Sequence, residues 1–248
     1  MKILSIGNSF SIDAHRYLKR LSEEAGIPLT TANLYIGGCP LELHFRNAMG
    51  DIPAYALDFN GDAIPGLKVS IKQALLWDSW DYVTLQQASH FSAKFETYEP
   101  YLSELAAYIR KYCPKTKLLI HQTWAYEEGS DRLKTVAKYD TAEQMLKDVV
   151  NAYGLAAKAV DAYGIIPSGE AMQEALRRGV ARIHRDTFHA DFNIGRALLS
   201  EVWLTALSGR DLRELELPSI CGVTDENEKK IIREVAYDLC AKYGWIKE

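Results

Sequence analysis

KILSIGNSFS, residues 2–11, contains a short apolar run, a Gly-Asn-Ser turn and the start of a helical pattern. This order predicts a buried strand followed directly by a helix, and open α/β sheets bind ligands at such strand ends. Ser9 would lie close to free backbone N–H groups and to the positive end of the helix, which both favour an oxyanion. Ser9 is therefore a candidate nucleophile, although a serine at this position can also simply cap the helix.

Further apolar segments alternate with helical patterns along the rest of the chain. Four of them predict strands, at residues 29–36, 81–86, 117–122 and 164–167. Helical patterns cover residues 13–25, 41–48, 69–77, 98–112, 141–163, 169–178, 193–208 and 224–243. Near-continuous apolar strands that alternate with helices are typical of a parallel sheet covered on both faces. We therefore predict an α/β fold, a three-layer α/β/α sandwich with a flavodoxin-like five-stranded parallel sheet.

Residues 51–66 depart from this alternation. Apolar residues alternate before the Asn60-Gly61-Asp62 turn, which is the turn chemistry of a β-hairpin. We expect a small hairpin that lies over one edge of a single domain spanning residues 1–248. A chain of 248 residues is long enough for one such core.

Bulk composition narrows the possible functions. The net charge is −4 and no cluster of Lys and Arg is present, which argues against nucleic-acid binding. Four widely separated cysteines form no CxxC pair, so neither a zinc site nor a disulfide framework is indicated. We expect no metal and no cofactor. No apolar run is long enough to cross a membrane and no leader is visible, so the default expectation is a cytoplasmic protein without a membrane partner. The sequence does not indicate an oligomeric state.

Asp186 and His189 lie three residues apart in a segment just before the helical pattern of residues 193–208. In such a turn an acid can reach Nδ1 of the histidine while Nε2 points toward a nucleophile from elsewhere in the chain. A DxxH spacing is common by chance, so the pair gains weight only from its combination with Ser9.

Four sequence blocks carry a resemblance to a known family. They are IGNSFS (6–11), the Gly37-Gly38 pair, WDYVTLQQ (80–87) and DTFH (186–189). In this order they resemble the SGNH hydrolases, relatives of the GDSL-type esterases and lipases, and most closely a bacterial branch of largely unassigned function. The resemblance extends from residue 2 to about residue 208. It implies that Ser9 is the nucleophile, His189 the general base and acid, and Asp186 the residue that orients the imidazole.

The resemblance also implies an oxyanion hole. Its donors would be the Ser9 N–H and the Gly38 N–H, with Gly37 close by, together with an asparagine side chain after the third strand. That asparagine is absent here, and its position falls to Gln86 or Gln87, of which we favour Gln86. A glutamine amide donates the same N–H from one methylene further out.

We therefore expect a serine esterase that hydrolyses O-acetyl or other short acyl groups on carbohydrates or small molecules. Candidates to line the pocket are Gly37 and Gln87, together with His121 and Trp124 at and just after the end of the fourth strand. The resemblance implies that the loops 51–66, 88–97 and 123–138 set specificity. A non-catalytic carbohydrate- or ligand-binding module on the same fold is the alternative, because the asparagine is missing. Binding of a nucleotide phosphate is less favoured, since the first turn has one glycine rather than a glycine-rich loop.

Overall fold

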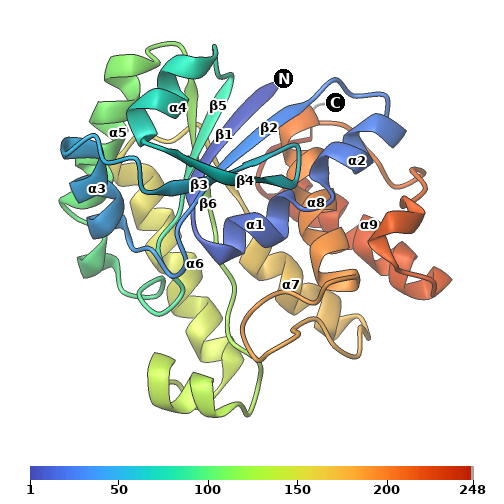
Figure 1. Cartoon of the computed structure of the whole chain (residues 1–248). Helices are drawn as coiled ribbons and strands as arrows, with labels where there is room; N and C mark the ends of the chain where they lie inside the picture. Colours follow the sequence, from blue (N-terminus) through green and yellow to red (C-terminus); the bar gives the residue numbers. More distant parts are fainter. Residues whose placement is uncertain (247–248) are drawn as a thin grey trace.

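A seven-stranded mixed sheet forms the centre of the computed structural model, which describes residues 1–246 (Figure 1). The strand order is β4-β3-β2-β1-β5-β6-β7. The strands are β1 Lys2–Gly7, β2 Thr30–Tyr35, β3 Tyr55–Phe59, β4 Asp62–Val69, β5 Tyr82–Leu85, β6 Lys117–His121 and β7 Gly164–Ile166. The five strands predicted from the apolar segments are β2, β1, β5, β6 and β7. They are adjacent and parallel, which confirms the predicted α/β class and its parallel sheet.

Strands β3 and β4 form the predicted hairpin, but the hairpin does not lie over the edge of the sheet as expected. It extends the sheet instead. Strand β3 pairs antiparallel with β2, and β4 pairs antiparallel with β3, so the full sheet is mixed. The chain also remains extended to Val69, which moves the start of the following helix from the predicted residue 69 to Ile71.

Helices cover both faces of the sheet (Figure 1). They are α1 Ser9–His15, α2 Leu18–Glu24, α3 Leu41–Met49, α4 Ile71–Trp77, α5 Tyr101–Tyr112, α6 Ala142–Ala159, α7 Ser168–Arg177, α8 Ile194–Ser208 and α9 Glu226–Lys242. Short helical turns lie at Phe95–Thr97, Leu133–Ala137 and Ser219–Cys221. Helices α1, α2 and α9 pack on α8 on one face, while α3 and α4 pack on α5 on the other. None of the helices in residues 1–246 combines the length and the hydropathy needed to cross a membrane.

The first helical region is divided in two, whereas the sequence pattern predicted one helix over residues 13–25. The hairpin turn contacts the end of α1. A Cβ atom at Gly61 would lie 2.8 Å from the carbonyl oxygen of Arg16, and Arg16 donates a hydrogen bond back to the Gly61 carbonyl oxygen. Gly61 also has φ +86°, which favours glycine. The hairpin turn therefore packs where the first helix stops, an interaction that the helical pattern alone does not encode.

Candidate active site

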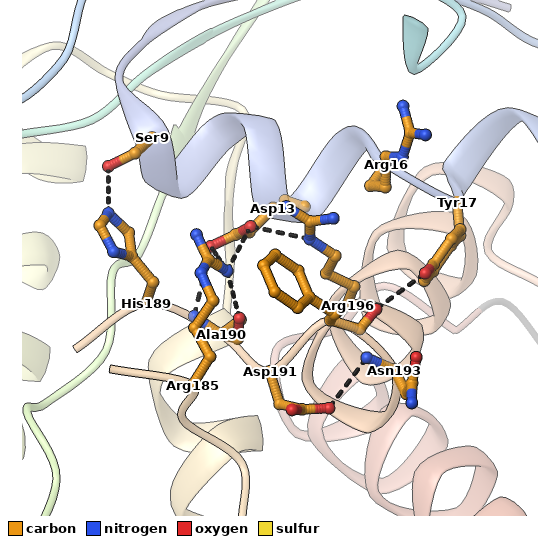
Figure 2. A network of polar contacts seen from close by, with 12 residues as sticks. Ser9, Asp13, Arg16, Tyr17, Arg185, His189, Ala190, Asp191, Asn193 and Arg196 are labelled. Atoms are coloured by element: carbon orange, nitrogen blue, oxygen red, sulfur yellow. Dashed lines mark hydrogen bonds and ion pairs between the residues drawn. The ribbon is translucent and has the colours of Figure 1, made fainter. Parts of the chain in front are cut away.

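Ser9, His189 and Asp186 form a continuous hydrogen-bonded series at the carboxyl end of β1. The Oγ atom of Ser9 lies 2.8 Å from Nε2 of His189, and Nδ1 of His189 lies 2.8 Å from Oδ2 of Asp186 (Figure 2 shows the Ser9–His189 contact). The backbone N–H of His189 also donates to Oδ1 of Asp186, at 2.9 Å. Because the carboxylate accepts the hydrogen on Nδ1, Nε2 is left to accept the Ser9 hydroxyl proton.

The charge of Asp186 is stabilised by the histidine that it orients. Partial burial of Asp186 works against its ionised form, but the two hydrogen bonds from His189, together with the positive charges of His189 and Arg185, hold the pKa of the carboxyl below its usual value. A carboxylate that stays ionised is the partner needed to stabilise an imidazolium formed during proton transfer.

Asn8 caps helix α1, which frees Ser9 from that role. The Asn8 side chain accepts a hydrogen bond from the Phe10 N–H at 3.1 Å, and Ser9 is the first residue of the helix. The alternative in which Ser9 is only a helix cap therefore does not describe this structure. The serine hydroxyl is directed at His189 instead.

Asp13 connects the helix that carries Ser9 to the segment that carries the acid and the histidine. Its side chain is fully buried and accepts hydrogen bonds from Arg185 at 2.9 and 3.0 Å and from Arg196 at 2.9 Å (Figure 2). The backbone N–H of Ala190 donates to the same carboxylate at 3.2 Å. Two guanidinium groups and one backbone N–H thus converge on a single carboxylate, one helical turn after Ser9.

An aromatic stack supports the histidine. The Phe188 ring lies 3.8 Å from the His189 ring, and the Phe10 ring is stacked on Trp124 at 4.0 Å with an interplanar angle of 7°. The indole N–H of Trp124 donates to the Phe188 carbonyl oxygen at 2.7 Å. Trp124 was predicted to line the pocket, but the structure buries it completely beneath the histidine segment, where it supports the site from behind.

A cavity of about 460 Å³ opens in front of Ser9. It is lined by Asn8, Ser9, Ile12, Tyr35, Gly37, Gly38, Ser89, His90, Arg132, Arg185, Phe188 and His189. The predicted residues Ser9, Gly37, Gly38 and His189 are therefore together at one cavity, whereas Gln86, Gln87, His121 and Trp124 are not part of its wall. The volume lies within the range of small-molecule sites, roughly 300–1,000 Å³.

The backbone N–H groups of Ser9 and Gly38 belong to two residues of the cavity wall. Within residues 1–246, neither of them donates a hydrogen bond to another residue. Gly38 has φ +61°, a conformation that glycine adopts without strain, and a Cβ atom there would contact nothing within 4 Å. The backbone shape of this turn, rather than space, therefore favours glycine at position 38.

Gln86 is placed differently from the predicted oxyanion donor. It is buried, its Nε2 donates to Oδ1 of Asn8 at 2.8 Å, and its Oε1 lies 2.6 Å from Nδ1 of His121. Asn8 in turn donates to the carbonyl oxygen of Cys39, the residue after Gly38. The nitrogen and the oxygen of the Gln86 amide are therefore both hydrogen-bonded inside the protein. Oδ1 of Asn8 accepts from both Phe10 and Gln86. Gln86 supports the Ser9 turn and the Gly38 turn from behind.

His121 and Gln87 also have internal roles rather than the predicted pocket roles. Complete burial lowers the pKa of His121 to about 3, so its ring is neutral near pH 7. Nδ1 then carries the hydrogen donated to Gln86, and Nε2 accepts from the Ser168 hydroxyl, 3.2 Å away. Gln87 accepts from the Leu41 N–H at 3.0 Å and donates to the Thr97 carbonyl oxygen at 3.0 Å, which fixes the loop after β5.

Replacing Gln86 with methionine distinguishes a structural role of the Gln86 amide from a role as an oxyanion donor. We expect Gln86→Met to lower the free energy of unfolding by about 2 to 4 kcal/mol, because buried polar groups of Asn8 and His121 lose their partner. Urea unfolding followed by circular dichroism measures this change. The matched control is Gln144→Met on an exposed part of α6, which should change it by less than about 0.5 kcal/mol. A roughly hundredfold loss of activity at unchanged stability would instead restore the oxyanion role.

Several cavity residues were not identified from the sequence. Phe188 lies inside the Asp-Thr-Phe-His block, so the spacing of that block could have pointed to it. Tyr35 ends β2 and lies on the same sheet edge as Ser9, which is a second usable signal. Arg132 comes from the irregular loop after β6, and no local pattern distinguishes it from the other cations of that loop. In residues 1–246, no group of three or more His, Cys, Asp or Glu side chains is arranged to hold a metal ion.

The fold is that of solved SGNH- and GDSL-type hydrolase structures. Two solved structures of this kind are similar to the chain. A candidate SGNH hydrolase from Slackia heliotrinireducens shares 21% identity, covers 84% of this chain and 98% of its own length, and has a TM-score of 0.60. A candidate GDSL-like lipase from Parabacteroides merdae shares 15% identity over 84% of this chain and 95% of its own, with a TM-score of 0.57.

The chain belongs to a family described as a domain of unknown function, DUF4886, whose model matches residues 2–239. The crystal structure of a DUF4886 family protein from Bacteroides uniformis shares 35% identity with it, covers 100% of this chain and 97% of its own length, and has a TM-score of 0.89. No curated protein matches the sequence.

Proposed function

We propose that the protein is a serine esterase that hydrolyses carboxylic esters of small molecules or carbohydrates. One observation carries the proposal: the hydrogen-bonded series from Asp186 through His189 to the Ser9 hydroxyl ends at an open cavity of about 460 Å³. The series contains an acid, a base and a nucleophile at hydrogen-bond distances, which is the arrangement that nucleophilic acyl transfer requires.

The reaction would proceed in two steps. Ser9 Oγ attacks the ester carbonyl carbon while Nε2 of His189 takes the hydroxyl proton, and the carbonyl oxygen becomes an oxyanion. The N–H groups of Ser9 and Gly38 stabilise that oxyanion. When the tetrahedral intermediate collapses, the bond to the alcohol oxygen breaks and His189 returns the proton to the departing alcohol. Water, deprotonated by His189, then attacks the acyl carbon; the bond to Ser9 Oγ breaks, His189 returns the proton to that oxygen, and the carboxylic acid leaves.

We propose that the substrates carry short acyl groups. Gly37 and Gly38, which have no side chains, line the cavity together with Ser9, Tyr35 and Phe188. O-acetyl esters, including acetylated sugars, are therefore the first substrates to test. The acyl series from acetyl to octanoyl on a 4-nitrophenyl leaving group should show its highest kcat/KM at the short end.

Covalent labelling tests the proposal most directly. A fluorophosphonate probe should modify the native protein, and peptide mass spectrometry should place the adduct on Ser9. Heat-denatured protein is the control, because an unfolded chain loses the base next to the serine. Hydrolysis of 4-nitrophenyl acetate and of acetylated xylose, followed in parallel, reports turnover.

A non-catalytic binding module is the alternative, and one observation favours it. The inward placement of the Gln86 amide leaves the site without the side-chain donor that SGNH hydrolases take from an asparagine. Such a module would bind a ligand in the cavity and would neither react with the fluorophosphonate nor release 4-nitrophenol. Modification of Ser9 together with turnover excludes it.

A further inference from the structure

Arg132 differs from the other arginines of the described chain. Within residues 1–246, every other arginine donates a hydrogen bond or forms an ion pair. The Arg132 guanidinium has neither; it lies over the Phe188 ring, 3.7 Å from its centroid, and lines the cavity in front of Ser9. A guanidinium carries five N–H donors in a fixed planar arrangement. Within residues 1–246, none of these donors is used in a hydrogen bond to another residue.

The charges around the histidine are balanced without Arg132. Asp13 pairs with Arg185 and Arg196, and Nε of Arg185 also lies 3.9 Å from Asp186. Two carboxylates thus face two guanidinium groups in this cluster. Arg132 adds one positive charge to the cavity, and no aspartate or glutamate belongs to the cavity wall.

His90 is a second histidine of the cavity wall besides His189. Partial burial lowers the pKa of His90, and the positive charges of Lys94 and Arg132 lower it further. His90 is therefore mostly neutral near pH 7 and adds no positive charge to that of Arg132 in the cavity wall. A ligand that carries a single negative charge matches it.

Arg132 lies close to the residues proposed to react with the ester. Arg132 lies on one side of the Phe188 ring, and the His189 ring lies 3.8 Å from the same ring. The cavity that Arg132 lines is also the cavity that contains Ser9, and it has room for one small molecule. One ligand can therefore contact both residues.

We propose that the substrate of this site is an ester that carries a carboxylate, and that Arg132 binds the carboxylate while Ser9 attacks the ester group. Arginine binds a carboxylate through two parallel N–H···O hydrogen bonds, which fixes orientation as well as charge. The inference rests on the proposed esterase function and adds the chemical class of its substrate.

Matched ester pairs test the inference. One pair, 4-acetoxybenzoate and its methyl ester, places the charge on the alcohol side; the other, 4-nitrophenyl hydrogen adipate and 4-nitrophenyl methyl adipate, places it on the acyl side. In at least one pair, kcat/KM should favour the charged ester. Arg132→Gln should lower the ratio of charged to neutral kcat/KM by about 10- to 100-fold, the size of one charge-assisted hydrogen-bonded contact.

Arg20→Gln is the matched control, because Arg20 is an exposed arginine of α2 that pairs with Glu23. It should leave the ratio unchanged in both pairs. An equal ratio in the parent and in Arg132→Gln, for both pairs, would overturn the inference while leaving the esterase function intact.

A binding measurement separates this inference from the proposed function. Calorimetry with the Ser9→Ala protein measures the affinity of 4-acetoxybenzoate and of its methyl ester without turnover. Tighter binding of the charged ester, lost in the Ser9→Ala, Arg132→Gln double variant, supports the anion site even if the parent hydrolyses no ester. Equal affinity for the two esters, or no effect of Arg132→Gln, overturns it.

Discussion

Ser9→Ala is expected to lower kcat/KM for 4-nitrophenyl acetate by at least about 10⁴-fold, since removing the nucleophile of a comparable triad in subtilisin costs more than this. The Ser9 hydroxyl is the group that Nε2 of His189 contacts at 2.8 Å, and alanine leaves the base without a proton to accept. The backbone N–H of residue 9 and the cavity remain, so residual activity reflects binding and oxyanion stabilisation alone. Initial rates at saturating and limiting substrate measure the change.

Ser22→Ala provides the matched control. Ser22 is a buried serine of α2 whose hydroxyl donates only to the Lys19 carbonyl oxygen, and its replacement should leave kcat/KM within about twofold. If Ser9→Ala retained more than a tenth of the parent activity, another nucleophile would have to account for the hydrolysis, and the proposed mechanism would be wrong.

The elements that position this serine could be read from the sequence because their signals are local. An apolar run that ends in Gly-Asn-Ser defines both a strand and its carboxyl end, and all parallel strands deliver their carboxyl ends to one edge. Asp186 and His189 are three residues apart, so one turn is enough to bring the carboxylate to the ring. The predicted nucleophile, base and acid are adjacent in the structure for these reasons, although their catalytic roles remain predictions.

Side-chain direction at the end of β5 could not be read in the same way. The Gln86 amide could face the cavity or the interior, and the local sequence does not distinguish these two directions. The interior placement is the one observed because Asn8 and His121, from two other strand ends, offer an acceptor and a donor at the right positions. Asn8 and His121 can be recognised as partners of the Gln86 amide only when the strands are assembled into the sheet.

The placements of the hairpin and of Arg132 likewise could not be predicted, because they depend on residues far apart in the sequence. Alternating residues with an Asn-Gly turn indicate a hairpin, but its pairing with the edge of β2 depends on backbone groups that no local pattern describes. Arg132 belongs to a loop with several charged residues, and only the folded chain shows that it lies over Phe188. Tertiary contacts, rather than local preference, decide both placements.

Asp13→Asn is expected to have the second largest effect, on stability and on the reaction together. The substitution keeps the side-chain shape but removes the buried charge that pairs with Arg185 and Arg196. Breaking a buried ion pair in this way typically costs about 3 to 5 kcal/mol of unfolding free energy. Arg185 and Ala190 flank His189, so the loss should also displace the histidine from Ser9. A displacement of the order of 1 Å can cost about a hundredfold in rate.

Positioning by Asp13 is distinguished from a purely structural role by a variant of similar stability. Leu105→Ala, at a fully buried position of α5 on the other face of the sheet, should cost about 2 to 5 kcal/mol. Both variants are compared at a temperature where circular dichroism shows them fully folded, and the rate of Ser9 labelling by the fluorophosphonate is measured. Asp13→Asn should slow labelling at least about tenfold, whereas Leu105→Ala should match the parent. Equal rates in both variants would mean that Asp13 only stabilises the fold, because a displaced histidine cannot activate the serine.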